Sequence, residues 1–232
     1  MPPRQSATRS ADTPRVDRKM VILLSAERLF ARHGYRAVTI RQIAQEAEVP
    51  LALVDYYFGQ KHELFRAIFD HWRGTLQERL SLLDAARRSA PADRVLQRVV
   101  EAFVLPVLRL RASSEGESYA QLVARELLYR TPETQQMLTD YFDPMAHAFI
   151  DALHAISPGS TRGAAAWAYQ FALGALLHHI SDDRVERLSH GENTACEPSA
   201  APLLVNFICA GIGAVLAPPP ARVRATTPRR PR

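Results

Sequence analysis

Apolar residues recur every three or four positions along most of this chain. The clearest run starts after Lys61 and comprises Leu64, Phe65, Ile68, Phe69, Trp72, Leu76, Leu80 and Leu83. This spacing puts the apolar side chains on one face of an α-helix, so it predicts one long helix that ends near Arg87. No segment alternates apolar and polar residues as a half-buried strand does. We therefore predict an all-α fold.

The same period predicts helices elsewhere in the chain. Gly34 is expected to end the first of them, because glycine adopts the backbone conformation found just past helix ends. Pro106 and Pro144 fall inside helical patterns, where proline kinks the backbone. The expected helices, separated by segments rich in Gly, Pro and Ser, cover about 20–33, 93–112, 118–130, 133–156, 160–188 and 200–217.

Length and cysteine content limit the class of protein. A chain of 232 residues that is 47% hydrophobic can form one sizeable domain or two small ones. Its cysteines, Cys196 and Cys209, cannot form a disulfide framework, which fits a reducing cytoplasm. No apolar run follows the basic N-terminus, so we expect no signal peptide. The apolar runs 164–180 and 203–217 fall short of the roughly 20 residues that span a bilayer, and we interpret them as buried helices.

The positive charge is concentrated at the two ends. The net charge is +5, but residues 1–19 carry +3 and residues 218–232 carry +5, which leaves the remainder at −3. We predict a disordered basic arm over 1–18 and a disordered Pro/Arg-rich tail over 218–232, since such segments cannot bury apolar surface. Both can be solvated ends without a role, or cationic arms that add salt-dependent affinity for phosphate.

The segment 39–58, TIRQIAQEAEVPLALVDYYF, carries the functional motif. Thr39 and Gln42 match a capping box at the start of a helix. Val49-Pro50 breaks the chain, and Leu53, Val54 and Phe58 then give a second short helix an apolar side. Two short helices around a tight turn form a helix-turn-helix, whose second helix fits the major groove of DNA.

Residues 24–65 resemble the DNA-binding domain of the TetR family of bacterial regulators. The resemblance lies in AERLFARHGY (26–35), TIRQIAQEA (39–47), V-x-x-x-x-V-x-Y-Y-F-G-x-K (49–61) and the ELF that follows at 63–65. It implies a three-helix reader over 19–65 and a helical bundle over 66–217 that binds a small molecule and dimerises. It also implies a cytoplasmic bacterial repressor without a cofactor.

The resemblance implies specific DNA contacts. Thr39, Tyr56, Tyr57 and Lys61 are expected to contact phosphates. Arg41 can reach a base edge, most often guanine, or a phosphate. Leu51 and Ala52 are placed at the tip of the reading helix. Asp55 departs from the family pattern: it can accept from cytosine, or it can hold Arg41, which is the use we favour.

Glu48 also departs from the pattern, because the family often has glycine at this turn position. A glutamate there must adopt a less favourable backbone conformation, unless the turn itself differs.

The bundle residues suggest an effector that is largely apolar, such as an acyl chain or an aromatic acid. Tyr129, His147 and His178 are further polar candidates, and a plain core role remains open for every one of these residues. The predicted ligand contacts are Phe103, Leu108, Leu122, Glu126, Phe142, Met145, Phe149, Trp167, Gln170 and Phe171.

The segments 164–180 and 203–217 are apolar on nearly all sides. Such helices need cover on both sides, which the bundle core and a second copy of the chain can provide. Ala210, Gly211, Gly213 and Ala214 would permit close approach. We therefore predict a homodimer with a four-helix interface, and a near-palindromic operator.

Other functions are less well supported. His178 with Asp182, and His147 with His154, do not make a recognisable metal-ligand set. Cys196 alone is weak evidence for redox sensing. No catalytic motif is visible, so we expect no enzyme. The alternative is a helical lipid-binding protein or enzyme whose helix-turn-helix has lost its function.

Overall fold

The computed structural model describes residues 17–129 and 131–217, and these residues contain helices and no strand. The chain divides into two compact units between His71 and Trp72. The predicted boundary after residue 65 falls inside a helix. Apart from Asp17 and Arg18, the predicted basic arm and tail lie outside the described residues.

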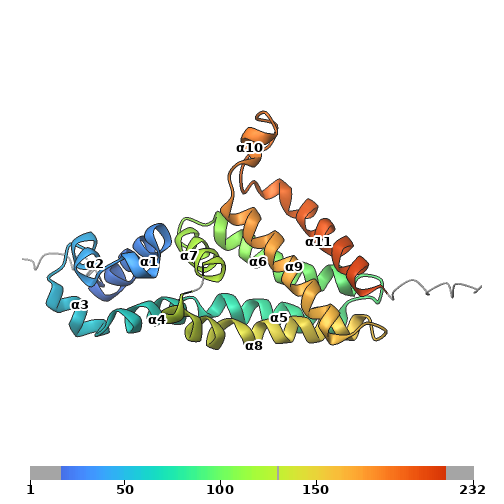
Figure 1. Cartoon of the computed structure of the whole chain (residues 1–232), viewed down its shortest axis with the longest axis horizontal. Coiled ribbons are helices and arrows are strands. Elements are labelled where there is room, and N and C mark those ends of the chain that lie inside the picture. The colour runs from blue at the N-terminus through green and yellow to red at the C-terminus, as the bar shows by residue number, and fades with distance from the viewer. Residues whose placement is uncertain (1–16, 130, 218–232) are drawn as a thin grey trace, which may run out of the picture. The chain divides into compact units, whose positions relative to one another are not determined.

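The first unit comprises four helices, which are labelled in Figure 1. Its core is an aromatic cluster in which Phe30 and Phe65 pack edge to face, with ring centroids 5.0 Å apart. Tyr35 and Phe69 extend this cluster at 4.8 and 5.2 Å from Phe65. The helices are α1 (Arg18–Ala37), α2 (Ile40–Glu46), α3 (Leu51–Phe58) and α4 (Lys61–His71).

Local signals explain how these helices begin and end. Asp17 caps α1 by accepting from the backbone N–H groups of Lys19 and Met20. Gly34, the predicted end of the first helix, leaves helical geometry at φ 78°, but a short helical stretch follows it and α1 continues to Ala37. The predicted capping box of α2 is also present: Thr39 Oγ1 accepts from Gln42 N at 3.3 Å, and Gln42 Oε1 accepts from Thr39 N at 2.8 Å.

The turn between α2 and α3 is a Schellman motif. Glu48 N–H donates to Gln45 O at 3.1 Å, and Val49 N–H donates to Ala44 O at 3.0 Å. Glu48 has φ 52°, the left-handed conformation that this motif usually assigns to glycine. Of the two possibilities for Glu48, the less favourable backbone is therefore the one the chain adopts.

The second unit is a helical bundle (Figure 1). Phe103 on α6, Phe149 on α8 and Tyr169 on α9 meet in its core, with ring centroids 5.2 and 5.4 Å from that of Phe103. The unit comprises α5 (Arg73–Ser89), α6 (Val95–Ala112), α7 (Glu117–Leu128), α8 (Pro132–Ile156), α9 (Arg162–Ser181), α10 (Val185–Leu188), the 3-10 turn η1 (Pro198–Ala200) and α11 (Ala201–Leu216).

Two predicted helices are each divided in the structure. The expected long helix after Lys61 is interrupted at Trp72 (φ −93°, ψ 8°), where Thr75 Oγ1 donates to the Trp72 carbonyl at 2.8 Å. The expected helix 160–188 ends at Ser181, and α10 follows after a short break. Helices α6 and α8 continue through Pro106 and Pro144.

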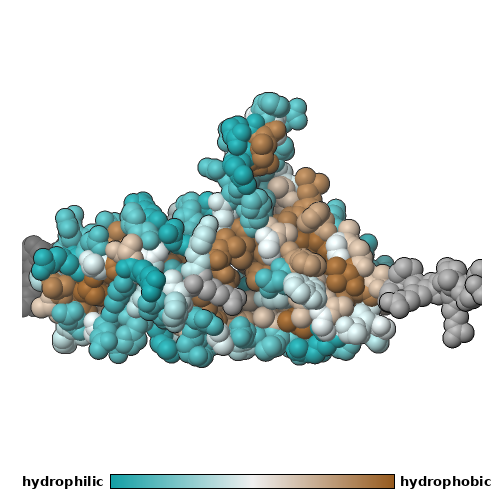
Figure 2. All heavy atoms as spheres, viewed as in Figure 1, coloured by the Kyte–Doolittle hydropathy of each residue, from teal (hydrophilic) through white to brown (hydrophobic). Residues whose placement is uncertain are grey.

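Helices α9 and α11 pack against each other and are buried on one side only. In this single chain, Trp167 and Phe171 of α9 are 62% and 59% exposed, and Leu203 and Phe207 of α11 are 70% and 69% exposed. Figure 2 shows the resulting apolar surface over these helices. The inner sides are buried as expected, and the cover of the outer sides by a second copy stays a prediction.

One helical stretch among the described residues, Pro198–Leu216, is long and apolar enough to cross a membrane by length and composition. Only 22% of that window is buried within the chain.

Candidate nucleic-acid interface and ligand cavity

Helix α3 carries an exposed face of the kind a reading helix needs. Val54 and Phe58 point into the core of the first unit, which turns the opposite side of the helix outward. That outward side is composed of Leu51, Ala52, Asp55, Tyr56 and Tyr57. Leu51 is 42% exposed and Tyr56 is 80% exposed, so both can be reached from solvent. All five predicted α3 contacts are thus accessible.

The predicted contacts outside α3 are accessible to different degrees. Thr39 is the N-cap of α2 and Arg41 lies in its first turn, and both are exposed. Lys61 begins α4 and is half-buried, and its Nζ lies 4.3 Å from the centroid of the Tyr35 ring. This cation–π contact holds the ammonium group close to the α1–α2 connection.

The expected pairing of Asp55 with Arg41 does not occur. Neither side chain forms an ion pair or hydrogen bond in the described part of the chain. Both groups are exposed, and an exposed ion pair gains little over separate hydration. Asp55 therefore does not hold Arg41 in the DNA-free chain, and its role at the DNA, toward Arg41 or toward a base edge, stays a prediction.

The second unit encloses a cavity of about 300 Å³. Its walls come from α5, α6, α7, α8 and α9 and are mainly apolar, with Leu76, Val123 and Leu177 as typical members. This volume lies at the lower end of the range for small-molecule sites. The polar side chains of the wall are Thr75, Arg79, Tyr119, Asp143, His147, Tyr169 and Gln170.

The structure separates the predicted ligand contacts into three groups. Phe142, Met145 and Gln170 line the cavity. Leu108, Leu122 and Glu126 do not line the cavity, and Leu122 and Glu126 are buried in the core. Phe103 and Phe149 line a separate narrow gap of about 10 Å³. Trp167 and Phe171 lie on the outer surface of α9. Helical spacing identifies apolar positions but cannot distinguish a wall from the core behind it.

Of the additional polar candidates, only His147 lines the cavity. Tyr129 is 72% exposed, and His178 lies in a separate surface depression beside α10, 3.9 Å from Asp182. No group of three or more His, Cys, Asp or Glu side chains in the described residues is placed to hold a metal ion.

Arg79 is a charged residue of the cavity wall that is not among the predicted ligand contacts. It is 6% exposed, and its guanidinium carbon lies 4.8 Å from the Phe103 ring centroid and 5.7 Å from that of Phe149. Burial lowers the pKa of Arg79 to about 10, so the group remains charged at neutral pH. Its position three residues after Leu76 and four before Leu83, on the apolar face, is the signal that could have found it.

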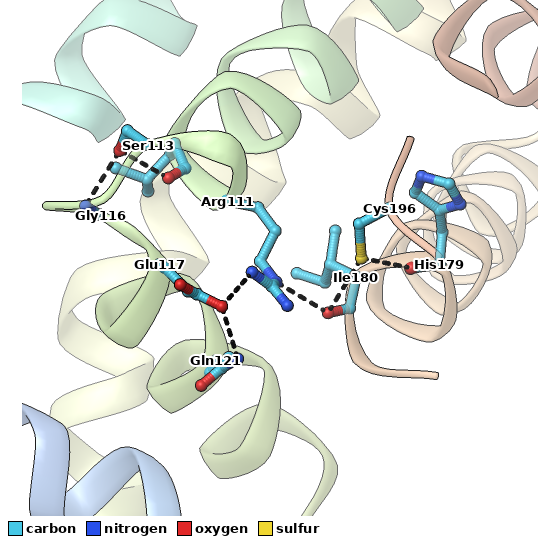
Figure 3. Close-up of polar contacts among 9 residues, drawn as sticks. Arg111, Ser113, Gly116, Glu117, Gln121, His179, Ile180 and Cys196 are labelled. Carbon is cyan, nitrogen blue, oxygen red and sulfur yellow. Dashed lines mark hydrogen bonds and ion pairs between the residues drawn. The ribbon is translucent and has the colours of Figure 1, made fainter. Parts of the chain in front are cut away.

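A polar network joins three helix ends near the cavity (Figure 3). Arg111 Nε donates to the Ile180 carbonyl at 3.3 Å, and its Nη1 pairs with Glu117 at 2.7 Å. Cys196 Sγ lies 3.6 Å from the His179 carbonyl and 3.9 Å from that of Ile180. These contacts satisfy carbonyl groups that the end of α9 leaves without helical partners.

We call the first unit, α1–α4, which contains the helix-turn-helix, the reader. A reader followed by a helical bundle with an internal cavity defines a helix-turn-helix regulator with a sensor domain. Known proteins support this class. Residues 22–68 match the model of "Bacterial regulatory proteins, tetR family", and residues 101–211 match "Tetracyclin repressor-like, C-terminal domain". The chain belongs to the TetR family.

The relatives differ in how much they share with this chain. An HTH-type transcriptional repressor of Mycobacterium tuberculosis is 37% identical over 93 residues, which are 40% of this chain and 46% of that protein. The chain thus matches less than half the length of that relative.

Solved structures share the fold over most of the chain. AmtR of Mycobacterium smegmatis matches with a TM-score of 0.59 and 20% identity, over 88% of this chain and 90% of that one. FadR of Bacillus subtilis, crystallised with stearoyl-CoA, matches with a TM-score of 0.53 and 16% identity, over 83% and 98%.

Proposed function

We propose that this chain is a transcriptional regulator that binds operator DNA as a homodimer and is released by a small hydrophobic effector. The observation that carries the proposal is the outward face of α3, where apolar and aromatic side chains remain exposed beside a capped helix-turn-helix. In the major groove, Leu51 and Ala52 would meet base edges, while the tyrosine hydroxyls would reach phosphates.

The exposed face of α9 and α11 supports the dimer. Four large apolar side chains there, Trp167, Phe171, Leu203 and Phe207, are more than half exposed in the single chain. Gly174 and Gly211 lie on the same helices, and a Cβ at either position would meet no atom within 4 Å, so the backbone is open to close approach. A second copy would cover this surface and present two reading helices about 34–36 Å apart.

Release requires that the effector bind the DNA-free form better than the operator-bound form. The path we propose starts at α5, which contributes Thr75, Leu76 and Arg79 to the cavity wall and is joined through Trp72 to α4 of the reader. A shift of α5 would change the separation of the two readers. Equal effector affinity for the free and operator-bound protein would contradict this mechanism.

The proposal assigns the chain to the cytoplasm, where operator DNA lies. It also assigns the apolar side of α11 to the second copy instead of lipid. Recovery of the chain in the membrane fraction of lysed cells would contradict that assignment.

DNA binding can be tested with two single variants, each of which adds one negative charge at a different site. Ala52→Glu adds a carboxylate at the tip of α3, and we expect it to weaken specific binding roughly tenfold or more, because the groove is lined by phosphates. The matched control is Ala85→Glu, at an exposed position of α5 in the other unit, which should bind like the unaltered protein.

The measurement is fluorescence anisotropy, at several salt concentrations, on DNA upstream of the encoding gene and on genomic fragments. Absence of any sequence-specific binding would overturn the regulator proposal in favour of a lipid-binding protein or enzyme. Equal losses in the two variants would show that bulk charge, not the α3 face, determines binding.

A further inference from the structure

The cavity wall contains one buried cation. Arg79 extends from α5 among apolar neighbours and is 6% exposed. Its Nε and Nη2 have no hydrogen-bond partner among the described residues, and no described acidic group forms an ion pair with it. A buried arginine normally has hydrogen-bonded acidic partners, because removing the charge from water is costly.

The neighbours of Arg79 compensate this charge only in part. The faces of Phe103 and Phe149 attract the guanidinium group but accept no conventional hydrogen bond. Tyr119 and Tyr169 also act on its charge and line the cavity. Burial raises the pKa of Tyr169 above its usual value, so this phenol is neutral at pH 7 and is no counter-ion.

Two other ionisable groups belong to the cavity wall. Asp143 and His147, both on α8, are exposed, and neither forms an ion pair with Arg79. The buried part of the wall therefore carries a single positive charge within an apolar surface. A ligand that fits both properties has one anionic group and an apolar body.

We propose that the effector is an amphipathic carboxylic acid whose carboxylate pairs with Arg79 and whose apolar part fills the remaining cavity. A guanidinium group can hold a carboxylate through two parallel hydrogen bonds, and Nε and Nη2 form the edge of Arg79 suited to that geometry. The inference rests on the proposed function, because it specifies the ligand class of the proposed effector site.

The test compares acids with their uncharged esters. Hexanoate, decanoate, tetradecanoate and 4-phenylbutyrate, each paired with its methyl ester, are titrated into the full-length protein by isothermal calorimetry. The best-fitting acid should bind the unaltered protein roughly 10- to 100-fold more tightly than its ester, the range expected for a charge-assisted hydrogen bond.

Arg79→Met removes the charge and keeps the side-chain bulk, so it should abolish the preference for the acid while the ester still binds. Arg79→Lys should keep part of the preference, because it keeps the charge without the planar fork. Arg87→Met, on an exposed site of the same helix, is the matched control and should bind both ligands as the unaltered protein does.

Thermal unfolding without ligand checks that Arg79→Met folds. Its Tm should equal or exceed that of the unaltered protein, since an apolar side chain replaces a buried cation that lacks a described acidic partner.

The outcomes separate the two proposals. Equal binding of acid and ester overturns the carboxylate inference and leaves the effector cavity intact. Failure of every acid to bind also overturns it. Tight acid binding that does not weaken operator binding supports the ligand class and contradicts the proposed release mechanism. Retention of the acid preference in Arg79→Met would place the anionic contact elsewhere and overturn the inference.

Discussion

Glu48 has an unfavourable backbone conformation in a turn whose hydrogen bonds are otherwise well formed. Both hydrogen bonds of the Schellman motif are present, so the turn geometry is kept. The strain lies in the backbone of Glu48 itself, which has φ 52°. A left-handed conformation costs a residue with a Cβ roughly 1–2 kcal/mol. The chain thus gives up part of its stability at the entrance to the reading helix.

We expect Glu48→Gly to raise the free energy of unfolding of the reader by about 1 kcal/mol, because glycine adopts this conformation without a steric penalty. Glu48→Ala serves as the control: it removes the charge but keeps the Cβ, so it should gain little. Urea denaturation followed by circular dichroism measures both. Equal stabilisation by both variants would attribute the effect to the charge instead of the backbone.

Residue patterns predicted the reader well and the cavity poorly. Thr39, Gln42 and Gly34 act through hydrogen bonds and dihedral angles that depend on neighbours in sequence, so their roles could be predicted. Arg79 owes its importance to Phe103 and Phe149, which are far away in the sequence. Tertiary packing decides which side of an apolar helix faces a cavity. Helical spacing alone therefore could not predict that Trp167 and Phe171 lie on the outer surface of α9.

At the level of elements, the end of α9 depends on Arg111. This side chain is 19% exposed and contacts both the Ile180 carbonyl and Glu117 (Figure 3). Arg109, two residues earlier on the same helix, instead pairs with Glu78 on the surface, where both side chains are about half exposed. The two arginines make ion pairs of similar length but differ in burial, which offers a direct comparison.

We expect Arg111→Ala to lower the free energy of unfolding by about 1–2 kcal/mol, because it leaves the partly buried Ile180 carbonyl with only the weak, distant Cys196 thiol as a donor. Arg109→Ala should cost between about 0 and 1 kcal/mol, as exposed pairs do. Chemical denaturation of the two variants tests this ordering. Equal costs would mean that burial of the Arg111 network does not contribute to stability.

Helix breaks were the least predictable elements. The apolar period runs through Trp72 without interruption, so the sequence pattern indicated one helix where α4 and α5 stand. The break is accompanied by a local contact between Thr75 Oγ1 and the Trp72 carbonyl, and it coincides with the limit between the two compact units. The apolar period of a sequence indicates which face of a helix is apolar. It does not indicate where a single residue leaves helical geometry.

At the level of the whole molecule, the proposed dimer makes a clear prediction. Phe207→Arg places a charge in the middle of the exposed apolar side of α11, and we expect the protein to become monomeric and to lose operator binding at concentrations where the unaltered protein binds. Leu128→Arg, at an exposed apolar position of α7, is the matched control and should remain dimeric.

Size-exclusion chromatography with light scattering measures the mass of each variant. A dimeric Phe207→Arg would assign the interface to another surface, and a monomeric unaltered protein would contradict the dimer altogether.

The position of α11 along the chain has a consequence for newly made protein. The reader is complete at His71, whereas α11 ends at Leu216. At bacterial translation rates the reader leaves the ribosome on the order of 10 seconds before the dimer helix does. If operator binding requires the proposed dimer, a nascent chain in that interval can fold its reader but can bind only one half-site, so it would bind the operator more weakly than a finished dimer.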